Sequence, residues 1–248
     1  MKIPLSKKLV FLSLFLLQGC LTNSTTDDKN NKAANVNAQL GALYLKKNQL
    51  ELANHKLSKA LRQDPNSSKV HHVYALLQER LGDDKKAAEH FQQAIRLKDN
   101  SPELHNNYGS YLCRTRQIIA AEKEFLTALQ YPLYKTPEFA YTNAGICVMN
   151  NGELKKANGY FRQALKANSR FPSVLYQLSR LNFKQKHYNR AEAFLQRYNE
   201  VARETPESLY LCAKIAKQLK DSQRDKECFS RLVEKFPHSP EIAKLDAF

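Results

Sequence analysis

The chain contains little glycine and proline and no tryptophan. Its 248 residues include 7 Gly, 9 Pro and no Trp, which argues against a turn-rich β-barrel and against a glycine-dependent nucleotide fold. Five cysteines are too few to build a disulfide scaffold. Charged residues at 25% and hydrophobic residues at 42% exclude a disordered chain and a polytopic membrane protein. The composition therefore favours an all-helical globular body.

Acidic residues are scarce beside basic ones. Lys and Arg number 39 against 24 Asp and Glu, a formal net charge of +15, and this charge indicates an acidic surface as the partner. Nucleic acid is the rival interpretation. The basic residues, however, are spread along the chain without a dense stripe, and the N-terminus carries an export signal. We therefore expect no nucleic-acid partner.

The one long apolar run lies at the N-terminus. Three lysines precede the stretch from Leu9 to Leu17, which is apolar except for Ser13 and too short to span a bilayer. It ends in Leu-Gln-Gly-Cys at 17–20, which resembles a bacterial lipobox. We predict a lipoprotein signal peptide at 1–19 and acylation of Cys20, palmitate included, as a membrane anchor. An ordinary secretory signal with a chance cysteine is the alternative.

The next residues are polar and show no apolar periodicity. Residues 21–33 read LTNSTTDDKNNKA, a composition that cannot offset the entropy lost on ordering. We predict that 20–33 form the lipidated cysteine and a flexible tether, which keeps the folded body close to its membrane. Leu21, rather than Asp, follows the cysteine, and by resemblance to bacterial lipoproteins this favours the outer membrane.

The rest of the chain repeats every 34 residues. The recurring positions are Ala53, Ala87 and Ala121; Leu57, Phe91 and Phe125; and Ala60, Ala94 and Ala128. After a two-residue insertion the pattern continues at Ala157, Phe161 and Ala164. This is the tetratricopeptide (TPR) spacing, in which small residues let two helices approach and large ones fill the gaps. No single pair buries its apolar face, so the units must stack.

The repeat predicts an all-α fold, a right-handed solenoid of six TPR helix-turn-helix units. The units are 34–67, 68–101, 102–135, 138–171, 172–205 and 206–239, followed by a C-terminal tail at 240–248. The sixth unit is degenerate, because Asp225 stands where an alanine is expected. A polar residue there suits a terminal unit whose outer face meets water.

The first helix of each unit is expected to line a concave groove. Aromatic, apolar and basic side chains on such a wall are the types that anchor peptides. The predicted docking wall in units 4 and 5 consists of Phe139, Ile146, Met149, Tyr176, Arg180 and Phe183. Tyr210, Lys214 and Lys217 fall at groove positions of unit 6. The alternative is that several of these residues only pack against the neighbouring unit. Ala38 and Ala42 stand where a carboxylate clamp for chaperone tails needs polar groups, so that ligand is not expected.

Cysteine and histidine positions give no catalytic or metal motif. Cys113 and Cys147 fall on adjacent first helices, and in an oxidising compartment a disulfide between them is feasible if their Cα atoms lie within about 7 Å. Cys212 and Cys228 are expected as buried thiols. His71 and His72 are sequential and cannot share a metal on a helix, and the chain has no H-E-x-x-H, G-x-S-x-G or phosphate loop. We expect no enzyme activity, cofactor or metal.

Two local stretches are more specific than the repeat. They are NNYGSYLC at 106–113 and YPLYKTPE at 131–138, which runs into NAGIC at 143–147. Together with the lipobox and the six units, they resemble the type IV pilus biogenesis and stability lipoproteins of Gram-negative bacteria, the PilF/PilW family. Family members commonly carry the same cysteine pair, so the resemblance also implies the Cys113–Cys147 bond.

The resemblance implies a pilotin-like role without catalysis. The lipoprotein would sit on the periplasmic face of the outer membrane, bind the pilus secretin subunit, and assist its localisation and multimerisation. No small-molecule substrate is implied. The alternative is a general periplasmic TPR scaffold of another envelope or secretion complex, because the same fold serves both roles.

Overall fold

The computed structural model describes residues 23–97 and 101–246. Within these ranges the chain forms thirteen α-helices and no strand, so the all-α prediction is confirmed. The helices are α1 (Asn23–Lys46), α2 (Leu50–Gln63), α3 (Ser68–Leu81), α4 (Asp84–Arg96), α5 (Pro102–Arg114), α6 (Ile118–Leu129), α7 (Pro137–Asn150), α8 (Leu154–Ala167), α9 (Pro172–Lys184), α10 (Tyr188–Asn199), α11 (Pro206–Leu219), α12 (Ser222–Lys235) and α13 (Pro240–Asp246).

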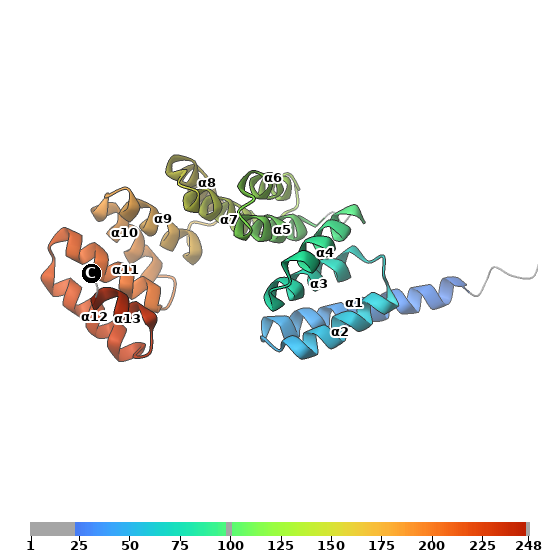
Figure 1. Cartoon of the computed structure of the whole chain (residues 1–248). Helices are drawn as coiled ribbons and strands as arrows, with labels where there is room; N and C mark the ends of the chain where they lie inside the picture. Colours follow the sequence, from blue (N-terminus) through green and yellow to red (C-terminus); the bar gives the residue numbers. More distant parts are fainter. Residues whose placement is uncertain (1–22, 98–100, 247–248) are drawn as a thin grey trace, which may run out of the picture.

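Consecutive helices form six antiparallel pairs, from α1 with α2 to α11 with α12. The pairs follow one another around an arch, with α1 and α2 at one end and α12 and α13 at the other (Figure 1). In the middle of the arch, α5 and α7 lie on the inner side and α6 and α8 on the outer side (Figure 1). This is the architecture of a TPR solenoid.

Short polar side chains and prolines set where the helices begin. Ser67, Ser101 and Thr205 accept a backbone N–H at the start of α3, α5 and α11, and this capping satisfies donors that the helix leaves unpaired. Proline occupies the first turn of α5, α7, α9 and α11, where its missing N–H is not needed.

The turn inside each pair has a left-handed residue at the same place in the repeat. These residues are Asn48, Gly82, Arg116, Gly152, Lys186 and Lys220. A positive φ is free of strain only for glycine, which explains the two glycines. The other four turns keep the same conformation with an ordinary side chain, so the packing of the two helices fixes the turn.

The recurring residues form the core between the helices. Phe91, Phe125 and Phe161 are completely buried, and the alanines on either side of them in the repeat, such as Ala87 and Ala94, are also at 0% exposure. The small residues therefore sit where the helices touch, and the phenylalanines fill the space between them.

The N-terminal end differs from the expected tether. α1 begins at Asn23, so residues 23–33 are helical and not a flexible linker. Ala34 is buried in the first unit, and once that part of the helix is anchored, each further residue adds a hydrogen bond at little cost. Asp28 and Lys32 also form an ion pair of 2.7 Å at i, i+4 spacing. The predicted signal peptide and Cys20 lie outside the described residues.

The C-terminal end differs from the expected tail. Residues 240–246 form α13, which packs against α11 and α12, and Leu245 joins their apolar cluster. Pro240 begins this helix 34 residues after Pro206 begins α11, so α13 stands where a seventh unit would start. It covers the end of the core that α12 would otherwise expose.

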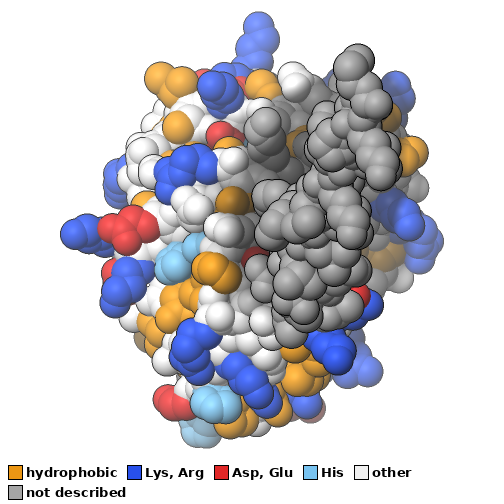
Figure 2. Space-filling model, turned by 90° about the vertical axis from the view of Figure 1, so that its right-hand side faces the viewer, with side chains coloured by type: hydrophobic (Ala, Val, Ile, Leu, Met, Phe, Trp, Pro, Cys, Tyr) orange, Lys and Arg blue, Asp and Glu red, His pale blue; other side chains and the backbone are white. Residues whose placement is uncertain are grey.

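Basic side chains dominate the charged surface at the α1 end of the arch. Figure 2 shows Lys and Arg distributed around the rim of this face, with few acidic side chains and with hydrophobic ones interspersed. The described helices include none that is long and apolar enough to cross a membrane.

Candidate partner-binding groove

The predicted docking wall lies on two neighbouring first helices. α7 carries Phe139 and Ile146. Phe139 is 45% exposed, and its ring lies 4.7 Å from the ring of Phe171 at the start of α9. Ile146 is partly buried and packs against the cluster that contains Phe161. Both side chains therefore remain in part accessible.

Met149 does not belong to this wall. Its exposed fraction is 1%, and it lies in the apolar cluster that includes Leu178 and Leu181 of α9. An unbranched thioether bends into gaps that a rigid ring cannot enter. Met149 is therefore a core residue between α7 and α9, which corrects the prediction that it lines the groove.

The α9 part of the wall combines an aromatic ring with a guanidinium group. The Tyr176 ring lies 5.7 Å from that of Tyr198, and its hydroxyl donates to the carbonyl oxygen of Glu207 at 3.4 Å. Burial raises the pKa of Tyr176 to about 12. The Arg180 guanidinium lies 6.0 Å from the centroid of the Tyr176 ring and donates to Oε1 of Gln177 at 2.9 Å.

A lysine of α11 extends this arrangement. Nζ of Lys214 lies 5.2 Å from the centroid of the Phe183 ring and 5.3 Å from that of Tyr210. We call Tyr176, Arg180, Phe183, Tyr210 and Lys214 the cation–aromatic surface. Tyr210 and Lys214 were absent from the predicted wall, although their places in the repeat match those of groove residues in unit 5.

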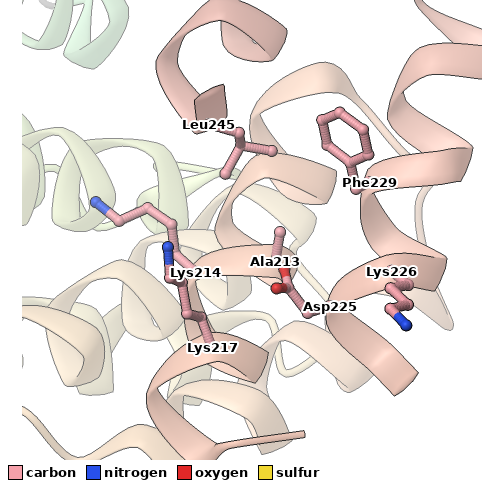
Figure 3. A pocket seen from close by; sticks show the side chains of 7 residues that line it. All are labelled: Ala213, Lys214, Lys217, Asp225, Lys226, Phe229 and Leu245. Carbon is pink, nitrogen blue, oxygen red and sulfur yellow. The ribbon is translucent and has the colours of Figure 1, made fainter. Parts of the chain in front are cut away.

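A pocket of about 180 Å³ adjoins this surface between α11, α12 and α13. Its lining consists of Ala213, Lys214, Lys217, Asp225, Lys226, Phe229 and Leu245. Figure 3 shows the two lysines of α11 on one side and Phe229 on the other, with Leu245 of α13 above. Asp225 occupies the position of the close-packing alanine of the other units. It is partly buried there and lines the pocket.

The inner helices of units 2 to 4 carry a different chemistry. Asn107 donates from Nδ2 to Nε2 of His72 at 3.0 Å, and Asn143 donates to Oδ1 of Asn106 at 3.0 Å. Each bond joins one unit to the next. Arg114 pairs with Glu79 at 3.0 Å and with Asp84 at 2.7 Å. The polar groups here satisfy one another and hold adjacent units together.

Four cysteines form two disulfides. Cys113 and Cys147 join α5 to α7 with a Cα–Cα distance of 5.7 Å. Cys212 and Cys228 join α11 to α12 with a Cα–Cα distance of 6.0 Å, whereas the sequence favoured buried thiols there. The first bond links unit 3 to unit 4, and the second joins the two helices of unit 6. Within the described part of the chain, no group of three or more His, Cys, Asp or Glu side chains could hold a metal ion.

Known proteins share both the repeat and the overall shape. Tetratricopeptide repeat family profiles match residues 39–102 and 149–215. The crystal structure of PilW, described as a widely conserved type IV pilus biogenesis factor, superposes with a TM-score of 0.80 at 31% identity, covering 87% of this chain and 99% of that one. The chain belongs to the PilF/PilW family of type IV pilus biogenesis TPR proteins.

A curated family member extends the similarity over nearly the whole sequence. The type IV pilus assembly protein PilF of Pseudomonas aeruginosa is 28% identical over 244 residues, which cover 96% of this chain and 97% of PilF. The solved PilF structure has a TM-score of 0.76 at 26% identity and covers 88% of this chain and 99% of that one. TPR proteins of this kind are generally scaffolds that bind peptides or proteins, and the inner wall of this chain offers side chains suited to that role.

Proposed function

We propose that this PilF/PilW-family protein is a non-catalytic adaptor that binds the pilus secretin and assists its localisation and multimerisation in the outer membrane. The observation that supports this most directly is the similarity to PilF along 96% of the chain. The accessible aromatic and basic side chains on α7, α9 and α11 supply a surface for a protein partner.

The proposed mechanism is physical rather than chemical. After removal of residues 1–19, acylated Cys20 would anchor the body to the periplasmic face of the outer membrane. Tethering one partner raises the effective concentration of a second site to the order of mM for a short linker, which favours assembly of secretin subunits into a ring. Residues 23–33 of α1 are helical, so they would act as a stiff spacer of about 16 Å.

The proposed docking wall now consists of Phe139, Ile146, Tyr176, Arg180 and Phe183. Phe139 and Arg180 are the most informative to change, since neither belongs to the fully buried core. We expect Phe139→Ala with Arg180→Gln to reduce secretin capture in a pull-down. The control is Ile119→Ala with Arg190→Gln, at exposed positions of α6 and α10. Equal capture by both double variants would show that the wall lies elsewhere.

Deletion of the gene tests the function itself. We expect the secretin to remain monomeric, or to stay in the inner membrane, when outer-membrane fractions are run on a gel that preserves heat- and detergent-resistant multimers. A Cys20→Ala chain should restore the multimers poorly, because it lacks the anchor. Normal multimers in the deletion strain would overturn the secretin role and favour a scaffold of another envelope complex.

A further inference from the structure

We infer that the inner surface of α9 and α11 recognises an acidic polypeptide segment with an apolar side chain between its carboxylates. The inference specifies the segment that the adaptor binds and therefore rests on the proposed function. It depends on three features of the described residues: the charge of the two helices, the way their cations are held, and the pocket beside them.

Positive charge is concentrated on these two inner helices. α9 carries Arg180 and Lys184 and no acidic residue, and α11 carries Lys214 and Lys217 with Glu207 as its one acidic residue. The preceding inner helix, α7, has Glu138 and no basic residue. Positive charge therefore rises from α7 to α9 and α11, and these two helices complement a run of carboxylates.

Aromatic rings hold two of the cations in place. Arg180 lies over Tyr176, and Lys214 lies near both Phe183 and Tyr210. A cation held over rings has fewer conformations to lose when a carboxylate binds. Within the described residues Arg180 makes no ion pair, and its guanidinium donates to the neutral side chain of Gln177. Its remaining guanidinium donors suit bidentate binding of a carboxylate.

Arg114 gives the contrast that makes Arg180 informative. It occupies the inner helix of unit 3, but Glu79 and Asp84 already neutralise it at 3.0 and 2.7 Å. Its guanidinium therefore serves contacts within the protein. Recognition of an acidic segment is for this reason assigned to units 5 and 6 and not to the whole inner wall.

The pocket supplies the apolar part of the site. Ala213, Phe229 and Leu245 form its apolar lining, while Lys214 and Lys217 line its edge toward the inner surface. Asp225 and Lys226 complete its lining. An apolar side chain placed between Phe229 and Leu245 would bring the carboxylates on either side of it to the lysines.

The test uses a defined acidic probe. The full chain in detergent is titrated into a fluorescent peptide in which pairs of glutamates flank leucines. A peptide with glutamine in place of each glutamate is the control, and fluorescence anisotropy measures binding of both. We expect the glutamate peptide to bind at least about tenfold more tightly, with an affinity that falls as salt rises. Equal affinity for the two peptides would overturn the inference.

Variants locate the binding. Arg180→Gln with Lys214→Gln should weaken glutamate-peptide binding by at least about tenfold, the size expected when charged contacts are removed. Lys166→Gln with Arg190→Gln removes the same charge from exposed positions of α8 and α10 and should leave it unchanged. Arg180→Lys with Lys214→Arg keeps both charges and should bind the glutamate peptide more tightly than the Gln pair does, which separates lost charge from lost folding. An equal loss of peptide binding in the Arg180→Gln/Lys214→Gln and Lys166→Gln/Arg190→Gln variants would overturn the assignment. So would a single-stranded oligonucleotide that binds as tightly as the glutamate peptide.

Secretin capture separates this inference from the proposed function. If Arg180→Gln with Lys214→Gln loses the peptide but captures secretin normally, the surface does not hold the secretin segment and this inference fails while the function stands. If the deletion strain forms normal secretin multimers, the function fails regardless of how the peptide binds.

Discussion

A Cβ atom placed on Gly145 of α7 would lie 2.4 Å from Cε1 of Phe161 of α8. The same contact recurs in unit 3, where a Cβ on Gly109 would lie 2.8 Å from the ring of Phe125. Separations this short do not occur between real side chains, so in these two units the helices are closer than any residue except glycine allows. This contact sets the geometry of the inner wall, because α7 carries Phe139 and Ile146.

Gly145→Ala is expected to destabilise the protein by about 1–3 kcal/mol, because the Phe161 ring is buried and cannot move away. The matched control is Gly159→Ala in α8, where an added Cβ meets nothing within 4 Å. That change should stabilise by about 0.4–1 kcal/mol through the unfolded chain. Urea denaturation of both variants measures the difference. Equal effects of the two substitutions would contradict the close approach.

Leu77 and Leu43 share one position in the repeat but have different surroundings. Leu77 is at 0% exposure in the buried apolar cluster of units 1 and 2, which also contains Leu57 of the preceding unit. Leu43 is 46% exposed, because no unit precedes it. We expect Leu77→Ala to reduce the free energy of unfolding by about 2–5 kcal/mol. Leu43→Ala should change it by no more than about 0.5 kcal/mol. A large loss from Leu43→Ala in the purified chain would show that another surface covers α1.

The sequence predicted the units well because their packing repeats. Each close contact between helices requires a small residue and a large partner at fixed places, such as Ala87 and Phe91, and such pairs are visible without coordinates. The fold class follows from this periodic pattern, whereas the family resemblance also depends on the local stretches at 106–113 and 131–147.

Features at the ends of the solenoid do not repeat, so the periodic pattern could not predict them. The polar residues 23–33 are helical because buried Ala34 anchors the helix that they extend, and composition does not reveal such an anchor. The prediction that Met149 lines the groove is wrong for a related reason. Phe183 holds the same place in unit 5 and is partly exposed, but the flexible Met149 side chain bends into the space beside α9.

The two disulfides are expected to contribute unequally to stability. The Cys113–Cys147 bond closes a loop of 34 residues and the Cys212–Cys228 bond one of 16. Chain-entropy arguments give about 4 and about 3 kcal/mol for these lengths. Alanine pairs at each site, compared by urea denaturation without reductant, measure the two contributions. The increase in mass on reduction counts the bonds in the protein purified without reductant. Cys212 and Cys228 present there as thiols would contradict the second bond.

His72 makes stability depend on pH. Burial lowers the pKa of its imidazole from 6.5 to about 4, with Glu103 opposing the shift, and Asn107 donates to its Nε2, which the neutral ring can accept. Because the folded pKa lies below the unfolded one, the unfolded chain binds more protons between these values. The free energy of unfolding should therefore fall as the pH drops from about 6.5 to about 4, by roughly 3 kcal/mol in total.

Replacing His72 tests this directly. His72→Gln removes the titrating ring, so its urea midpoint should fall less than that of the unmodified chain between about pH 7 and about pH 4.5. His238→Gln, at an exposed position, should leave the dependence as it is. If His72→Gln shows the same loss of stability in acid as the unmodified chain, the proton is taken up elsewhere. The junction between α3 and α5 would then not be the acid-sensitive part of the solenoid.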